Sequence, residues 1–186
     1  MTQETLCFLL EPSEVAEVSL RRFTYVNGTP CTTWGHNATV ALGQVEYPLS
    51  NDLEGDSTIL VDRTDPRWPI ACEHCGYSFL DTDEWQRNNH RMYRRADGTG
   101  GLTVLGQAPV GSMWYASWLK GLQGFRSPDG NILIVRTPGG DWVVDGPSTN
   151  GGGWTRTGIA PNVSVTPSIV IGSYHGFLTG GVLRSV

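Results

Sequence analysis

The sequence contains no apolar run that approaches the roughly 18 residues a membrane span needs. Its opening stretch, MTQETLCFLLEPSE, holds one short apolar block and no leading positive charge, so it predicts no secretory signal. Internal repeats, low-complexity tracts and long linkers are missing as well. We therefore expect a cytoplasmic protein (host cytoplasm if the chain is phage-encoded) with no membrane partner.

Positive charge is scarce. The chain has 13 Lys and Arg against 18 Asp and Glu, which gives a net charge of −5. Phosphate binding needs a concentrated basic face, so this balance argues against a nucleic-acid partner. The one short basic cluster, residues 87–95, lies beside the acidic run 81–84 and is interpreted as a solvated helix face.

What is present describes a globular domain. The 186 residues are 39% hydrophobic and 17% charged, and they fit one domain with a core of its own. The 24 glycines and seven tryptophans favour tight turns and short strands with large aromatic side chains between them. We expect a single domain over 1–186, with helices and strands in 1–100 and a β-rich region in 101–186.

Two helices are expected in the N-terminal half. Ser13 is placed to cap a helix over residues 13–25, whose apolar side chains fall near one face. Asp81 followed by Glu84 forms a capping box, which predicts a second helix over residues 82–94. Together with the strands below, these helices predict an α+β fold whose sheet comes mainly from the C-terminal half.

Short strands are expected wherever apolar runs lie between turn residues. The turn signals SPDG and PGGD make 131–145 a predicted hairpin. The candidate strands are NATVALGQVEY, STILVD, LTVL, NILIVRT, DWVVD, VSV, SIVIG and FLTGGVL.

The segment ACEHCGYSF carries the sharpest chemical signal. Cys72 and Cys75 are spaced so that two thiolates can bind one tetrahedral metal ion from a tight turn, which Gly76 allows. A second CxxC motif is absent, so the motif is half of a structural zinc site, and other residues must complete it. The candidates are Cys7, Cys31, His36, His74 and His90.

Among these candidates, Cys31 and His36 are the favoured pair, because five positions apart in one loop they can complete a Cys3His zinc site. His90 is the competitor. The alternatives for Cys72 and Cys75 are reduced structural thiols or a redox pair. A redox pair is disfavoured because the motif does not lead from a strand into a helix.

The segment PSIVIGSYHGFL offers a second candidate site. A serine hydrolase set is predicted here, with Ser168 as the nucleophile, His175 as its general base and Asp145 as the acid that orients the histidine. Asp141 is the second choice of acid, and nearby glycines offer backbone amides for an oxyanion site. No G-x-S-x-G elbow is present, and a serine beginning a turn with a hydrogen-bonded histidine explains the same residues.

Five segments of the chain belong together: CEHCGYSF…DEWQ, APVGSMWYASWL, PDGNILIVRTPGGDWVVDGPSTN, WTRTG and PSIVIGSYHGFLTGGVL. As an ordered set they resemble a family of phage-encoded proteins of unknown function. The match runs from Cys72 to the end of the chain, and WGHNATV extends it upstream. More remotely, PSI…HGFLTGGVL is similar to a domain of unknown function found beside bacterial ubiquitin-like conjugation operons.

The phage resemblance implies that a CxHCG knuckle, a serine-isoleucine pair and a YHGFL block belong together, here at 72–76, 168–169 and 174–178. The remote resemblance implies a protease of ubiquitin-like tails, in which Ser168 and His175 would be catalytic. This sequence departs from the phage relatives in one respect that affects the metal site. The phage relatives often carry further cysteines before the final block, whereas TNGGGWTRTGIAPNVSVTP has none, so completion of the zinc site stays open.

Three functions follow as hypotheses. The first is a zinc-binding serine hydrolase or peptidase that acts on a host ubiquitin-like or other protein. The second is a non-enzymatic, zinc-stabilised module that binds a protein partner. The third is a structural component of a virion.

Overall fold

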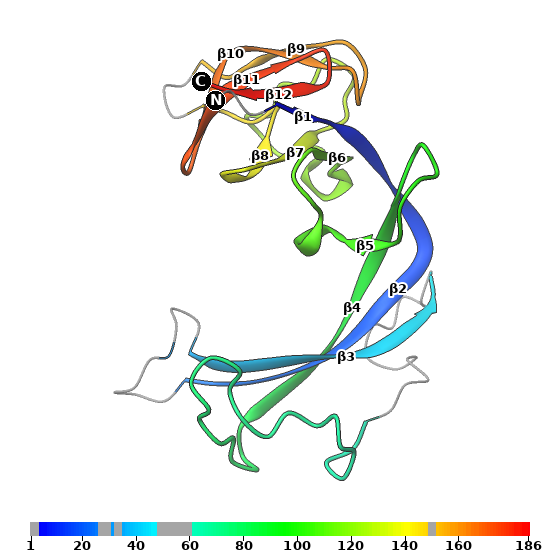
Figure 1. Cartoon of the computed structure of the whole chain (residues 1–186), viewed down its shortest axis with the longest axis vertical. Helices are drawn as coiled ribbons and strands as arrows, with labels where there is room; N and C mark the ends of the chain where they lie inside the picture. The colour runs from blue at the N-terminus through cyan, green and yellow to red at the C-terminus, as the bar shows by residue number, and fades with distance from the viewer. Residues whose placement is uncertain (1–3, 26–30, 32–34, 48–60, 149–151) are drawn as a thin grey trace. The chain divides into compact units, whose positions relative to one another are not determined.

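The computed structural model describes residues 4–25, 31, 35–47, 61–148 and 152–186 (Figure 1). Within these ranges the chain forms strands and two short 3₁₀ turns, Leu105–Gln107 and Ser117–Leu119, and no α-helix. It divides into two compact units: unit 1 comprises Met1–Glu11 and Tyr93–Val186, and unit 2 comprises Pro12–Met92. The expectation of a single domain stays a prediction.

Unit 1 contains an antiparallel sheet that joins the first and last strands of the chain (Figure 1). Along β11 (Tyr174–Thr179), Tyr174 and Leu178 are buried, while His175 and Phe177 are exposed. This alternation follows from the period of two of a strand, and it turns one face of the sheet toward the core. The strand order is β1 (Glu4–Leu6), β12 (Val182–Ser185), β11, β10 (Ser164–Ile171) and β9 (Thr155–Thr157).

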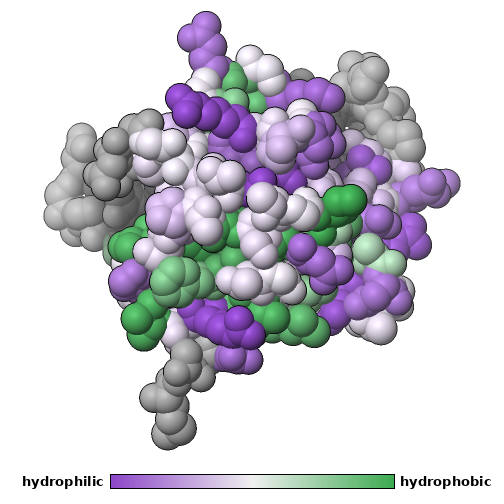
Figure 2. All heavy atoms as spheres, turned by 90° about the horizontal axis from the view of Figure 1, so that it is seen from above, coloured by the Kyte–Doolittle hydropathy of each residue, from purple (hydrophilic) through white to green (hydrophobic). Residues whose placement is uncertain are grey.

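The outward face of this sheet is not uniformly polar. Leu6, Val170 and Phe177 keep 72%, 67% and 46% of their surface exposed. Figure 2, which shows the molecule from above, has apolar surface gathered among polar side chains on the face turned to the viewer.

A second layer of unit 1 contains β6 (Ser112–Tyr115), β7 (Leu133–Thr137) and β8 (Gly140–Val143). β6 runs parallel to the first residues of β2 (Phe8–Thr24), and β7 and β8 form an antiparallel hairpin. The hairpin predicted over 131–145 is therefore confirmed. β5 (Thr103–Val104) lies next to β4 (Glu84–Arg95).

The main core of unit 1 lies between these two layers, because inward residues of both sheets form one buried cluster. Several predicted strands are confirmed here, including NILIVRT, DWVVD and SIVIG. The cluster contains Cys7, Met113, Leu133, Val135, Trp142, Val144, Val163, Val165, Ile169, Tyr174, Leu178 and Leu183.

In unit 2, most of β2 pairs antiparallel with β3 (His36–Glu46), which confirms the strand predicted at NATVALGQVEY. β4 lies on the other side of β2. Val18, Leu20, Leu42 and Trp68 form the buried core of this unit. The strand predicted at STILVD lies mostly outside the described residues.

The α+β fold class is wrong, since both predicted helices are strands. Residues 13–25 belong largely to β2, where Ala16, Val18, Leu20 and Arg22 are all buried. A spacing of two places these side chains on one face of a strand, whereas a helix would spread them around its axis. The position of the apolar residues near one face of the predicted helix was therefore a coincidence of their spacing.

The second helix, over 82–94, is also wrong, because these residues lie mainly in β4. The expected capping box does not form: the carboxylate of Asp81 lies 3.4 Å from the guanidinium of Arg63, and Glu84 begins β4. Ser13 likewise caps no helix. Its hydroxyl donates to the carbonyl of Met92 at 2.9 Å and so ties β2 to β4. Long-range pairing of the two strands overrides the local helix signals.

Candidate metal site

The CxxC motif lies at the tip of a tight hairpin over residues 70–79. The backbone N–H of Cys72 donates to the carbonyl of Tyr77 at 2.8 Å, and the N–H of Gly76 donates back to the carbonyl of Cys72 at 2.9 Å. Gly76 has φ of +74°, a left-handed conformation that favours glycine. The turn therefore presents the side chains of Cys72 and Cys75 from one short loop, as the sequence predicted.

The side chains of Cys31, His36, Cys72 and Cys75 come together around this turn. Their ligand atoms all lie within 4.8 Å of one another, so the group could hold a metal ion. The Sγ atoms of Cys31 and Cys72 are 3.8 Å apart, and Nδ1 of His36 lies 3.2 Å from Sγ of Cys75. A tetrahedral zinc with standard bond lengths separates its sulfur ligands by about 3.8 Å. The spacing therefore suits zinc.

His36 is held in place by stacking. Its ring lies on the ring of Tyr77, with centroids 4.2 Å apart and planes inclined by 18°. The side chain is 3% exposed at the start of β3, and Nδ1 faces the thiols. Nε2 is buried and has no hydrogen-bond partner among the described residues. Nδ1 is therefore the nitrogen available to a metal.

Two thiols of the group have strongly shifted pKa values. Burial raises the pKa of Cys72, but hydrogen bonds from the backbone N–H groups of His74, Cys75 and Asn37 and from the side chain of His36 bring it down to about 6. Burial and the neighbouring thiols Cys75 and Cys72 raise the pKa of Cys31 to about 12. Neighbouring thiolates repel one another, and a bound cation would remove that repulsion.

Arg22 holds the base of the hairpin, although the sequence gave no reason to assign it a role there. Its guanidinium donates to the carbonyls of Pro69 and Leu80, at 2.9 and 2.6 Å, and it lies over the rings of Trp68 and Phe79. The residue is 4% exposed, and burial lowers its pKa. One inward residue of β2 therefore ties together the two chain segments that lead into and out of the metal-binding turn.

The other candidate ligands lie apart from this group. Cys7 belongs to the core of unit 1, where burial raises its pKa to about 11. His90 is exposed on β4. His74 points its half-exposed ring toward Glu73, with Nε2 3.8 Å from the carboxylate. Of the alternatives weighed from the sequence, the pair Cys31 and His36 is the one that the fold brings to Cys72 and Cys75.

No hydrogen bond between the described side chains joins Ser168, His175 and Asp145 to one another. Asp145 is 2% exposed, and both of its carboxylate oxygens are occupied: Arg156 donates to Oδ1 at 2.9 Å and the backbone N–H of Leu133 to Oδ2 at 2.8 Å. His175 is exposed on β11, opposite Val170 of β10. Asp141, the second choice of acid, is paired with Arg136 at 2.7 Å. Both acids therefore already have arginine partners.

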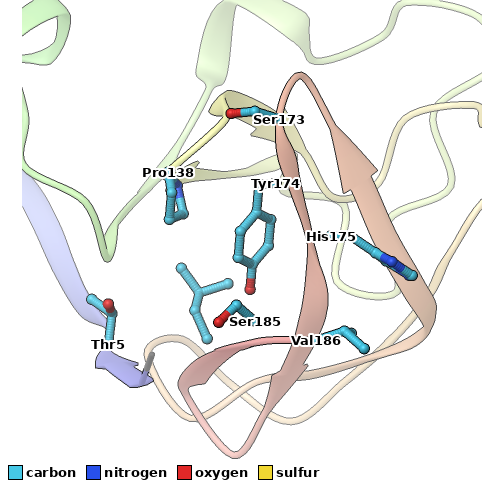
Figure 3. A pocket seen from close by; sticks show the side chains of 8 residues that line it. Thr5, Pro138, Ser173, Tyr174, His175, Ser185 and Val186 are labelled. Carbon is cyan, nitrogen blue, oxygen red and sulfur yellow. The ribbon is translucent and has the colours of Figure 1, made fainter. Parts of the chain in front are cut away.

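A cavity of about 270 Å³ in unit 1 is lined in part by His175, together with Thr5, Pro138, Ser173, Tyr174, Leu183, Ser185 and Val186 (Figure 3). The ring of Tyr174 points into it, whereas the ring of His175 lies on the opposite side of β11. Ser168 and Asp145 are not among its lining residues. The catalytic roles of Ser168, His175 and Asp145 stay predictions.

Comparisons with known proteins give no relative for this chain. No protein-family model matches it. Neither a curated protein nor a solved structure is significantly similar. The resemblances to the phage family and to the operon-associated domain therefore stay predictions. Among the described residues there is no helix with the length and apolar character to cross a membrane.

Proposed function

We propose that Cys31, His36, Cys72 and Cys75 bind one zinc ion, and that this ion stabilises unit 2 as a module for binding a protein partner. The observation that carries the proposal is the convergence of three thiols and one imidazole nitrogen within 4.8 Å. Three sulfurs and one nitrogen fill a tetrahedral zinc completely, which is typical of structural rather than catalytic zinc. The role of the ion is therefore to join the β2–β3 connection to the hairpin over 70–79.

Metal analysis of the purified full chain tests this proposal. We expect about one zinc ion per chain, because the four ligands complete one tetrahedral site. Replacement by cobalt should give the visible absorption of tetrahedral Co²⁺ and a near-ultraviolet band from sulfur-to-cobalt charge transfer. A chain that takes up neither metal when reduced and refolded with it would contradict the proposal.

The hydrolase hypothesis finds no support in the geometry, since the acid expected to orient His175 is buried against Arg156. We expect a fluorophosphonate probe, which labels activated serines, to leave the protein unlabelled, and Ser168→Ala to make no difference. Intact-mass spectrometry after incubation with the probe checks this. Labelling that disappears in Ser168→Ala would restore the hydrolase.

The proposed partner of the module is a protein of the host. The resemblance to phage-encoded proteins favours a host protein as the partner, and it also keeps a virion role open. Detection of the chain in purified particles would favour the virion role. Binding to a host protein that is lost on removal of zinc would favour the interaction module.

A further inference from the structure

We propose that Cys75 is a site of modification by hydroperoxides and that its oxidation expels the metal ion from unit 2. The inference rests on the zinc binding proposed above. It goes further by assigning one ligand a reactive role that its three neighbours do not share.

The four ligands differ in their access to solvent. Cys75 is exposed, whereas Cys72 and His36 are each 3% exposed and Cys31 is partly buried. A peroxide must reach sulfur directly, so oxidation of thiolates follows their exposure. Zinc keeps its sulfur ligands deprotonated, which leaves Cys75 as the thiolate that a small oxidant can reach.

A resolving thiol is already in place. A sulfenic acid becomes a stable disulfide only when a second thiol can attack it. The Sγ atoms of Cys31 and Cys72 both lie within 4.8 Å of Sγ of Cys75, because all ligand atoms of the group fall within that distance. Either sulfur is therefore close enough to be the resolving thiol for a sulfenic acid on Cys75.

The chemistry balances with hydrogen peroxide as the oxidant. The thiolate of Cys75 attacks one peroxide oxygen, which breaks the O–O bond and gives a sulfenic acid and hydroxide. A neighbouring thiolate, from Cys31 or Cys72, then attacks the sulfur of Cys75, forms the disulfide and expels a second hydroxide. Two sulfurs have lost one electron each, peroxide has gained two, and two protons from solvent convert the hydroxides to water.

The disulfide leaves zinc with one thiolate and His36 as protein ligands. Two ligands hold zinc far more weakly than four, so the ion leaves and the hairpin over 70–79 loses its link to Cys31 and His36. Cys7 provides an internal comparison, because its thiol is buried in the core of unit 1 with a pKa raised to about 11. Burial should protect it from the same oxidant.

The test uses the full chain, loaded with zinc and freed of reductant, with hydrogen peroxide as the probe. A chromogenic chelator in the solution reports zinc as it is released, and peptide mapping locates the disulfide. We expect stoichiometric zinc release, a disulfide that contains Cys75, and recovery of zinc binding after treatment with a dithiol reductant.

Two variants sharpen the test. Cys75→His offers a nitrogen ligand in place of the exposed sulfur, and its zinc should be released at least about tenfold more slowly, because the accessible thiolate is gone. Cys7→Ala should release zinc as the parent does. If Cys75→His fails to load zinc, the disulfide mapped in the parent decides the question.

Each failure has a distinct meaning. Retention of zinc by a loaded chain under peroxide would overturn the modification site and leave the zinc proposal intact. A disulfide between Cys31 and Cys72 with Cys75 still reduced would also overturn it. A chain that binds no zinc before peroxide is added would overturn both proposals.

Discussion

Replacing Cys72 with alanine should abolish stoichiometric zinc binding and unfold the part of unit 2 around the hairpin. Cys72 is 3% exposed and belongs to the ligand group, with its sulfur 3.8 Å from the sulfur of Cys31. Zinc bound by a structural site is worth about 10–16 kcal/mol in small zinc-binding peptides, which is comparable to the whole stability of a domain at about 5–15 kcal/mol. Arg22 holds the base of the hairpin at the carbonyls of Pro69 and Leu80, but the described core of unit 2 on which the turn could pack is small.

Metal content by mass spectrometry and hydrogen exchange of the backbone amides measure this outcome. In the Cys72→Ala chain, and in the parent treated with a strong chelator, we expect amides over 70–79 to exchange freely. His74→Ala is the matched control, because His74 lies in the same turn with a half-exposed ring outside the ligand group. A Cys72→Ala chain that keeps both its zinc and its protected amides would contradict the structural role.

The metal-binding turn could be predicted from the sequence because its signal is local. The CxxCG spacing requires a turn with a left-handed glycine, and Gly76 has that conformation in the structure. The completing pair, Cys31 and His36, was favoured for its spacing of five positions in one loop, but that spacing does not by itself bring the pair to the CxxC turn. That approach depends on β3 beginning at His36 beside the hairpin, which is a property of the tertiary fold.

The two helices were predicted wrongly for a related reason. A strand with one buried face should alternate between buried apolar residues and exposed polar ones. In β2 the buried face also carries a charged residue, because Arg22 is buried along with Ala16, Val18 and Leu20. From the sequence, an arginine at that position indicates a surface. In the structure it satisfies its charge with two carbonyls and two aromatic rings supplied by residues 68–80, more than forty positions away. No local pattern contains that information.

Asp145 shows how a residue with a plausible catalytic position can have a structural role. It ends the stretch DWVVD and precedes a glycine-proline turn, the position from which it was predicted to orient His175. Its carboxylate nevertheless joins two parts of unit 1, because it accepts from the side chain of Arg156 and from the backbone of β7 at Leu133. A buried carboxylate needs such partners, and here an arginine from β9 supplies one of them.

The second large effect is expected at this arginine. Arg156→Leu should lower the free energy of unfolding by about 3–5 kcal/mol, because it leaves the carboxylate of Asp145 buried without its cation. The side chains of Arg156 and Asp145 are both 1% exposed. Arg156 also donates to Asp129, Ser127 and the carbonyl of Asn131, so the loop over 127–131 loses its anchor as well.

The electrostatics support the same conclusion. Burial alone would lower the pKa of Arg156, yet its hydrogen bonds to Asp129 and Asp145 raise it above its usual value. The hydrogen bond from Arg156 in turn holds the pKa of Asp129 well below its usual range, against the effect of burial. Asp129 is 41% exposed and screened by solvent, so most of the expected loss comes from Asp145.

Chemical denaturation of the two chains measures the difference in unfolding free energy, and a thermal scan should show a melting temperature lower by roughly 10 °C. Arg184→Ala is the control, since its pair with Glu4 is exposed on both sides, with 46% and 58% of the side chains accessible. Loss of an exposed pair of this kind costs about 0–1 kcal/mol. An Arg156→Leu chain as stable as Arg184→Ala would show that the buried pair contributes no more than a surface one, and Asp145 would again be available for another role.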